Sequence, residues 1–316
     1  MKQYIFALIL LLIVVTICSG QQQETNLPKI FLKGLLSTGL NERDLAISPD
    51  GNEIFFTIVA PLNKFSAIFQ ISKQQNGTWS KPKTASFSGN YPDLEPAFSP
   101  GGRRIYFASK RPVNGVIKKD YDLWYTEKTK EDWGNPVHLG KDINSEMDEF
   151  YPSVASNGNL YFTASYNESA TKEDIFMAQL ENGNYLKPVP LDTAVNTSQY
   201  EFNAFIAPDE SYILFTAYGR KGDKGRGDIY LSLKRNGKWQ PAKQVESINS
   251  DKLDYCPTVS LNGKVLNFTS ERSEFKSEYS NQKVTYQDFT KIQRSPQNGN
   301  DDIYWVNFEP IINIYK

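Results

Sequence analysis

The chain has 316 residues, and its 35 Lys and Arg nearly balance 36 Asp and Glu, giving a formal net charge of −1. A protein that binds nucleic acid through its phosphates carries a basic excess, so this balance argues against a nucleic-acid partner. Beyond the N-terminal leader described next, Cys256 is the only Cys, which excludes an internal disulfide in the processed chain. Stability must therefore come from a packed core.

Residues 1–20 have the pattern of a signal peptide, with an early Lys followed by an apolar run from Tyr4 to Ile17. Small residues at Cys18 and Gly20 fit a signal peptidase site, so we expect cleavage before Gln21 and export to the periplasm or cell surface. Lipid anchoring through Cys18 is the open alternative, although Ile17 is larger than the residue that usually precedes a lipidated Cys. No later segment is long and apolar enough to span a bilayer.

A fivefold repeat follows the leader. Each copy has an acidic start, a short strand, a tight turn rich in Pro, Asp, Asn and Gly, and an aromatic-rich strand. A third strand and then an aromatic residue and a Pro complete most copies. The turns are Ile47–Gly51, Phe98–Gly102, Val154–Gly158, Ile206–Glu210 and Val259–Gly263, at spacings of 51, 56, 52 and 53 residues.

A repeat of four short antiparallel strands is typical of a propeller blade. We predict an all-β, five-bladed β-propeller in which residues 21–316 form a single domain; six blades are the alternative. The expected blades are residues 42–85, 91–140, 148–191, 200–245 and 254–308.

The last copy lacks a convincing fourth strand, whereas residues 28–34 form an unpaired strand ahead of the first copy. We therefore expect the N-terminal strand to complete the last blade, which would hide both open sheet edges. The alternative is that Ile311–Ile314 supplies this outer strand. An insertion at 273–300 has the composition of a short amphipathic helix over one rim.

The turn Ser48–Gly51, the strand Ile105–Arg111 and the later Asp-Ile-Tyr sequences resemble the Pro-Asp, WD-like repeat of TolB-like propellers, over about residues 28–308. The resemblance implies a periplasmic or cell-envelope protein that binds an envelope protein or a glycan, and we expect a monomer without catalytic activity. Some relatives add a Ser hydrolase domain. This chain has one His, His138, and no Gly-x-Ser-x-Gly elbow, so a Ser-His-Asp catalyst is not expected. We expect the His138 ring to be solvated.

One position of the repeat carries a carboxylate in every copy, seven residues before the Pro of the turn or its substitute. These residues are Glu42, Asp93, Glu149, Glu201 and Asp254. Two residues further on, the copies carry Asp44, Glu95, Tyr151, Asn203 and Cys256. If the strand that follows is innermost, both sets ring one mouth of the central channel. The five repeated carboxylates, with Asp44 and Glu95, are our candidate ligand-binding residues; no residue is assigned a catalytic role.

Three roles compete for these carboxylates. They could bind calcium through hard oxygen ligands, act as an acid and base pair of a carbohydrate-active enzyme, or accept hydrogen bonds from neighbouring backbone. We favour the third role, without a cofactor, because a feature present in every copy is more often scaffold. A second pattern predicts ion pairs that fasten hairpins. These pairs are Arg111 with Asp122, Arg220 with Asp228 and Arg272 with Asp302.

Overall fold

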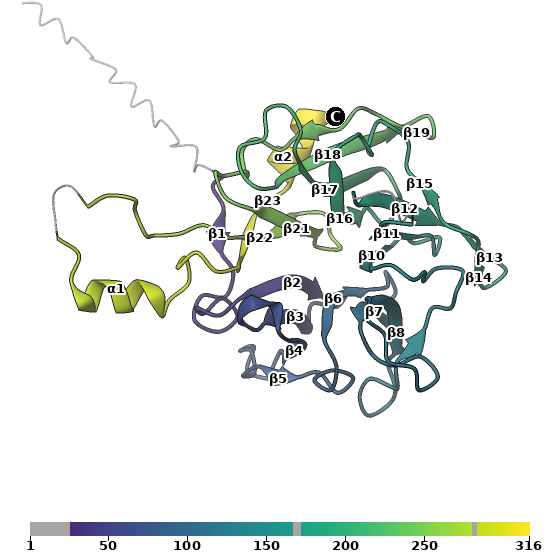
Figure 1. Cartoon of the computed structure of the whole chain (residues 1–316), viewed down its shortest axis with the longest axis horizontal. Coiled ribbons are helices and arrows are strands. Elements are labelled where there is room, and N and C mark those ends of the chain that lie inside the picture. The colour runs from purple at the N-terminus through teal and green to yellow at the C-terminus, as the bar shows by residue number, and fades with distance from the viewer. Residues whose placement is uncertain (1–25, 167–171, 280–282) are drawn as a thin grey trace, which may run out of the picture.

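The structure is a computed structural model that describes residues 26–166, 172–279 and 283–316. Five four-stranded antiparallel sheets surround a central axis as the blades of a propeller, which confirms the predicted fold (Figure 1). The predicted signal peptide and Cys18 lie outside the described residues. No helix among the described residues combines the length and the apolar character needed to cross a bilayer.

In the first four blades, chain order follows strand order from the axis outward. The first blade contains β2 (Glu42–Ile47), β3 (Glu53–Val59), β4 (Ser66–Ser72) and β5 (Lys83–Thr84). The second contains β6 (Asp93–Phe98), β7 (Arg104–Ser109), β8 (Asp122–Glu127) and β9 (Val137–His138). The third contains β10 (Glu149–Val154), β11 (Leu160–Ala164), β12 (Asp174–Ala178) and β15 (Val189–Pro190), with the small hairpin β13 (Leu180–Glu181) and β14 (Asn184–Tyr185) beside it.

The fourth blade contains β16 (Tyr200–Ile206), β17 (Tyr212–Tyr218), β18 (Asp228–Arg235) and β20 (Lys243–Gln244), with β19 (Lys238–Trp239) also paired to β18. The second strand of each blade is buried because neighbouring blades cover both of its faces. In β11, for example, every residue is buried. A strand covered on both faces reads as a continuous apolar run, which is why the aromatic-rich runs located these strands in the sequence.

The fifth blade is built from both ends of the described chain. It contains β21 (Asp254–Val259), β22 (Val265–Ser270) and β23 (Asp302–Asn307), and its outer strand is β1 (Lys29–Ile30). Lys29 lies opposite Trp305 and Ile30 opposite Tyr304 in antiparallel register. The predicted closure by the N-terminal strand is therefore confirmed.

The alternative closure by the C-terminal segment is wrong, because this segment forms the helix α2 (Glu309–Tyr315). Pro310 lies in its first turn, where the missing N–H of Pro costs no hydrogen bond. Ile311 and Ile312 are buried in the same core cluster as Phe308. The helix therefore packs onto the fifth blade instead of extending its sheet.

The insertion at 273–300 contains the expected helix, α1 (Tyr286–Gln293), which begins with a capping box between Thr285 and Asp288. The helix projects away from the blades instead of covering the rim (Figure 1). None of its residues is buried, and Phe289 makes a ring contact with Phe275 at 5.0 Å. This ring contact links the helix to the start of the insertion.

Candidate functional site

The five repeated carboxylates lie at or next to the start of each innermost strand, and all are buried. Each accepts hydrogen bonds from a Ser or Thr in the loop that enters its blade. Ser145 donates to Glu149 from its backbone N at 3.0 Å and from its Oγ at 2.6 Å. Thr197 does the same for Glu201, at 2.9 and 2.6 Å. The other pairs are Thr38 with Glu42, Ser88 with Asp93 and Ser250 with Asp254.

In three copies an Asn precedes this Ser or Thr and ties the same loop to the preceding blade. Asn144 accepts a hydrogen bond from the backbone N of Leu123 at 2.7 Å and donates to its carbonyl at 3.0 Å. Asn196 and Asn249 make the same pair of bonds to Ile175 and Ile229. We did not predict this motif from the sequence, although its signal is plain. It reads Ile143-Asn144-Ser145, Val195-Asn196-Thr197 and Ile248-Asn249-Ser250.

The prediction of ion pairs that fasten the hairpins is wrong. Each of the three Arg residues pairs instead with one of the five repeated carboxylates. Arg111 lies 2.7 Å from Asp93, Arg220 2.7 Å from Glu201 and Arg272 3.2 Å from Asp254. Each Arg turns this way because a backbone carbonyl near the repeated carboxylate offers it a second hydrogen-bond acceptor. Arg111, for example, also donates to the carbonyl of Phe87 in the entering loop, at 3.1 Å.

Glu42 and Glu149 have no such Arg partner among the described residues. Burial raises the pKa of Glu42 to about 7 and that of Glu149 to about 8. One carboxyl oxygen of each has no hydrogen-bond partner in the described part of the chain. A neutral carboxyl tolerates such a position better than a carboxylate does. Each of the five repeated carboxylates therefore anchors the loop that enters its own blade. Among the described residues, no group of three or more His, Cys, Asp or Glu is arranged to hold a metal ion.

The second residue set lies at the axis. Asp44, Glu95, Tyr151, Asn203 and Cys256 all have a positive φ, between 49° and 61°. In each blade this residue lies in a β-bulge, where the register between the first two strands shifts. A bulge re-aims a side chain, and here it places five buried, chemically different side chains around the centre.

These five residues contact one another across the blades. Cys256 donates to Asp44 at 3.0 Å, and Asn203 Nδ2 donates to Glu95 at 3.2 Å. The backbone N of Tyr151 donates to the other Glu95 oxygen at 2.7 Å. Asp44 and Glu95, both predicted site residues, are thus brought into one network. We call these five residues the central ring.

Arg43 links the two acidic members of the central ring. Its Nε donates to Asp44 at 2.8 Å, its Nη2 donates to Glu95 at 3.1 Å, and its guanidinium lies 4.8 Å from the ring centre of Tyr255. We did not predict a role for Arg43, yet a signal existed in the sequence. The equivalent residues of the other copies are all apolar or aromatic: Leu94, Phe150, Phe202 and Tyr255.

Burial sets the protonation of the central ring. Desolvation, and then the negative charge of Asp44, raises the pKa of Glu95 to about 8, although Arg43 opposes this shift. Burial also raises the pKa of the Cys256 thiol. The thiol therefore stays neutral and can donate its hydrogen bond to Asp44.

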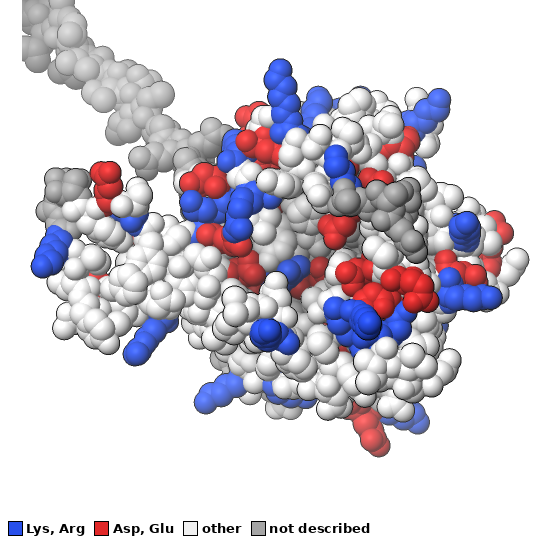
Figure 2. All heavy atoms as spheres, in the orientation of Figure 1, with Lys and Arg blue, Asp and Glu red and all other residues white. Residues whose placement is uncertain are grey.

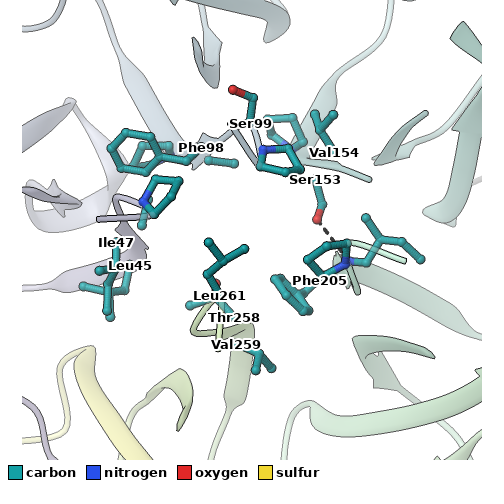
Figure 3. A pocket seen from close by; sticks show the side chains of 18 of the residues that line it. Leu45, Ile47, Phe98, Ser99, Ser153, Val154, Phe205, Thr258, Val259 and Leu261 are labelled. Carbon is teal, nitrogen blue, oxygen red and sulfur yellow. Dashed lines mark hydrogen bonds between the residues drawn. The ribbon is translucent and has the colours of Figure 1, made fainter. Parts of the chain in front are cut away.

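A pocket opens on each side of the central ring. The mouth pocket, on the side where the innermost strands begin, has a volume of ≈ 310 Å³. Its lining includes Arg43, Glu95, Tyr121, Phe150, Glu173, Phe202, Asn203 and Tyr255. The opposite pocket is smaller, ≈ 100 Å³, and its lining includes Ile47, Phe98, Phe205 and Leu261 from several blades (Figure 3). Because Glu95 lines both pockets, the central ring lies between them.

We expected a solvated ring at His138, but this side chain is only 21% exposed. It packs against Trp124 with ring centres 4.8 Å apart, and its Nε2 lies 3.1 Å from Asp122. The backbone N of Gly140 donates to its Nδ1 at 3.2 Å. His138 therefore has a structural role in the second blade, and it does not line the mouth pocket.

No protein-family model and no curated protein matches the sequence. Solved structures do match. A thermostable family-43 glycoside hydrolase has a TM-score of 0.51 at 10% identity, over 85% of this chain and 89% of that chain. Hydrazine synthase of Kuenenia stuttgartiensis has a TM-score of 0.51 at 13% identity, over 84% of this chain and 40% of that chain.

TolB of Acinetobacter baumannii is also similar, with a TM-score of 0.48 and 14% identity over 84% of this chain. The chain spans 54% of the length of that TolB chain. At these identities the likeness concerns the fold alone. A propeller fold serves unrelated functions, so function has to be argued from the pocket itself.

Proposed function

We propose that this protein is a non-catalytic binding propeller that holds a small ligand in the mouth pocket. The observation that carries the proposal is the contrast between the pocket's walls and its floor. The walls include the aromatic residues Tyr121, Phe150 and Phe202, while the acidic floor residue Glu95 is engaged within the protein. Aromatic walls with a few polar groups are typical of small-molecule sites.

The hydrogen bonds of the floor argue against catalysis. A glycosidase needs one carboxyl group to protonate the leaving oxygen and a second to act as nucleophile or base. Both oxygens of Glu95 accept hydrogen bonds from the protein, and Asp44 Oδ1 accepts from Arg43 and Cys256. Glu95 is thus held by the protein through both of its oxygens and Asp44 through one, which favours a structural role for both carboxyl groups.

A carbohydrate-active enzyme is the second candidate, and one observation favours it. The pKa of Glu95 is raised to about 8, which is the property expected of a general acid that lines a pocket. Asp44, which Arg43 links to Glu95, would then be the second carboxylate, acting as nucleophile or base. The family-43 glycoside hydrolase has a similar fold, and no more than that.

A glycan and envelope-protein screen tests the proposal, with binding measured by calorimetry. We expect a saturable ligand whose affinity falls about tenfold in Tyr121→Ala, because stacking on an aromatic wall contributes roughly 1 kcal/mol or more. Tyr286→Ala on the exposed helix α1 is the matched control and should bind like the parent. Equal binding by both variants would contradict the proposal.

Two further measurements in the same screen test for a calcium site and for a carbohydrate-active enzyme. Added calcium should change neither the affinity nor the melting temperature, because we propose that the protein has no metal cofactor. No ligand should be hydrolysed during incubation. Turnover that disappears in Glu95→Gln would instead establish the carbohydrate-active enzyme.

We further propose that the protein is an exported, monomeric member of the TolB-like Pro-Asp repeat family that acts in the bacterial cell envelope. The support is the leader sequence of residues 1–20 and the agreement of five repeat copies in order. The intact mass of the processed chain tests this. Cleavage before Gln21 is expected, and an acylated Cys18 would show lipid anchoring instead.

A further inference from the structure

Acidic side chains outnumber basic ones in the described lining of the mouth pocket. Among the described residues that line it, Arg43 is the only cation, whereas Glu95 and Glu173 are acidic. Arg43 is already engaged by Asp44 and Glu95, at 2.8 and 3.1 Å. Asp44 thus neutralises the positive charge of Arg43 within the floor, so Arg43 has little left to offer an anionic ligand.

Glu173 differs from the other acidic residues here, because no described residue donates a hydrogen bond or forms an ion pair to its carboxyl group. It lines the pocket just ahead of β12. Burial, and then the charge of Asp148, raises its pKa, and Arg43 opposes this only in part. An added positive charge in the pocket would relieve both effects.

Other charged groups lie near Arg43 and the aromatic wall. Asp301 lies near Arg43, and Glu271 near Asp301 is paired with the exposed Arg226. Lys110, which is half-buried beside the aromatic wall, donates to the carbonyl of Lys119 at 2.7 Å. Figure 2 shows acidic side chains on several sides of the hollow at the centre of the face in view. These acidic groups favour a cationic ligand over an anionic one at the mouth.

Two aromatic residues of the pocket lining already contact cationic side chains of the protein. The guanidinium of Arg43 lies 4.8 Å from the ring centre of Tyr255, and Lys110 Nζ lies 4.5 Å from that of Tyr121. Tyr121 is also packed against Phe150, with ring centres 5.2 Å apart. Such rings favour a cation over a neutral group of the same size.

We propose that the ligand of the mouth pocket is a small organic cation, whose ammonium group binds the Glu173 carboxylate beside the aromatic wall. This inference rests on the proposed binding function and names the class of ligand. It uses the one acidic pocket residue that the described part of the chain leaves without a partner. A neutral sugar would not satisfy that charge.

Calorimetry on the purified protein with three matched probes tests this: benzylamine, which is cationic near neutral pH, neutral benzyl alcohol and anionic benzoate. Benzylamine should bind about tenfold or more tightly than benzyl alcohol, as expected for a partly desolvated cation beside a carboxylate and an aromatic ring. Benzoate should not bind. Equal or tighter binding of benzyl alcohol would overturn the inference.

Glu173→Gln should lower the affinity for benzylamine to that for benzyl alcohol and leave benzyl alcohol unchanged. The matched control is Glu131→Gln, at an exposed loop position outside the pocket lining, which should bind both probes like the parent. An unchanged affinity for benzylamine in Glu173→Gln would overturn the inference. If the glycan and protein screen still finds a ligand that depends on Tyr121, the binding function stands and only the cation class fails.

Discussion

Two positions on each innermost strand, separated by a single residue, are both buried but differ in how they vary among the blades. The first carries Asp or Glu in all five blades, and each side chain binds the loop that enters its own blade. The second carries five different residues, whose side chains meet those of other blades at the axis. The first position thus repeats one local structure, whereas the second builds a single asymmetric centre.

This difference teaches where function can arise in a repeat protein. A residue needed to join each blade to the next is required in every copy, since every junction has the same geometry. The axis is shared by all blades and occurs once. Variation there leaves the junctions intact, so the mouth pocket can be adapted to a ligand without loss of the fold.

The five blades also differ at the first position, in whether its carboxyl group has an Arg partner. Asp93, Glu201 and Asp254 are paired with an Arg, whereas Glu42 and Glu149 have no such partner among the described residues. The same position is thus occupied by a charged pair in some blades and by a carboxyl group of raised pKa in others. The two solutions should respond differently to the same substitution.

The largest effect is expected in Glu201→Gln. Its carboxylate is fully buried and lies 2.7 Å from Arg220, whose side chain is 12% exposed. Removing one partner of a buried pair leaves an uncompensated charge, so we expect the free energy of unfolding to fall by about 3–5 kcal/mol. Urea denaturation followed by circular dichroism measures this change.

Glu149→Gln is the matched substitution in a blade without the Arg. Near neutral pH its carboxyl group is already largely protonated, so Gln should cost no more than about 1 kcal/mol. The double variant Glu201→Gln with Arg220→Met should recover much of the lost stability, because it removes the stranded charge. Equal losses in Glu149→Gln and Glu201→Gln would break the comparison.

Much of the fold could be predicted because its determinants are local and repeated. Turns rich in Pro and Gly, followed by aromatic-rich strands, recur at near-constant spacing, and the unpaired strand at 28–34 indicated the closure. The C-terminal segment was open to two interpretations, since an apolar run as short as Ile311–Ile314 fits a strand or a helix. Ile311 and Ile312 share a buried cluster with Val245 and Ile248 of the preceding blade, and such a tertiary contact is not encoded by the local pattern.

The ion pairs show why side-chain direction was harder to predict. Ser109, two residues before Arg111, lies opposite Asp93 on one neighbouring strand and opposite Asp122 on the other. Sequence spacing alone gives Arg111 two carboxylates to choose between. The loop carbonyl of Phe87 favours Asp93, and that loop is brought into place only by the folded chain. Arg43 was missed for a related reason, because it departs from the repeat in one copy only.

The smallest effect concerns pH and sharpens the same comparison. The pKa of Glu149 is raised from 4.5 to about 8, so the folded protein holds this proton more tightly than the unfolded chain does. Its contribution to stability is therefore complete below pH 4.5 and is lost as pH rises through about 8. Glu42, Glu95, Asp301 and Asp302 shift in the same direction. The parent should lose stability between about pH 5 and pH 9.

Glu149→Gln isolates one of these groups. Because Gln does not titrate, this variant should lose less stability than the parent between about pH 7 and pH 9, by roughly 1 kcal/mol. Melting temperatures across this range, measured in buffers of equal ionic strength, provide the test, with Glu131→Gln as an exposed control that should follow the parent. If Glu149→Gln follows the parent as well, the Glu149 carboxyl group is ionised in the folded protein near neutral pH. The distinction between Arg-paired and unpaired blades would then be one of geometry and not of charge.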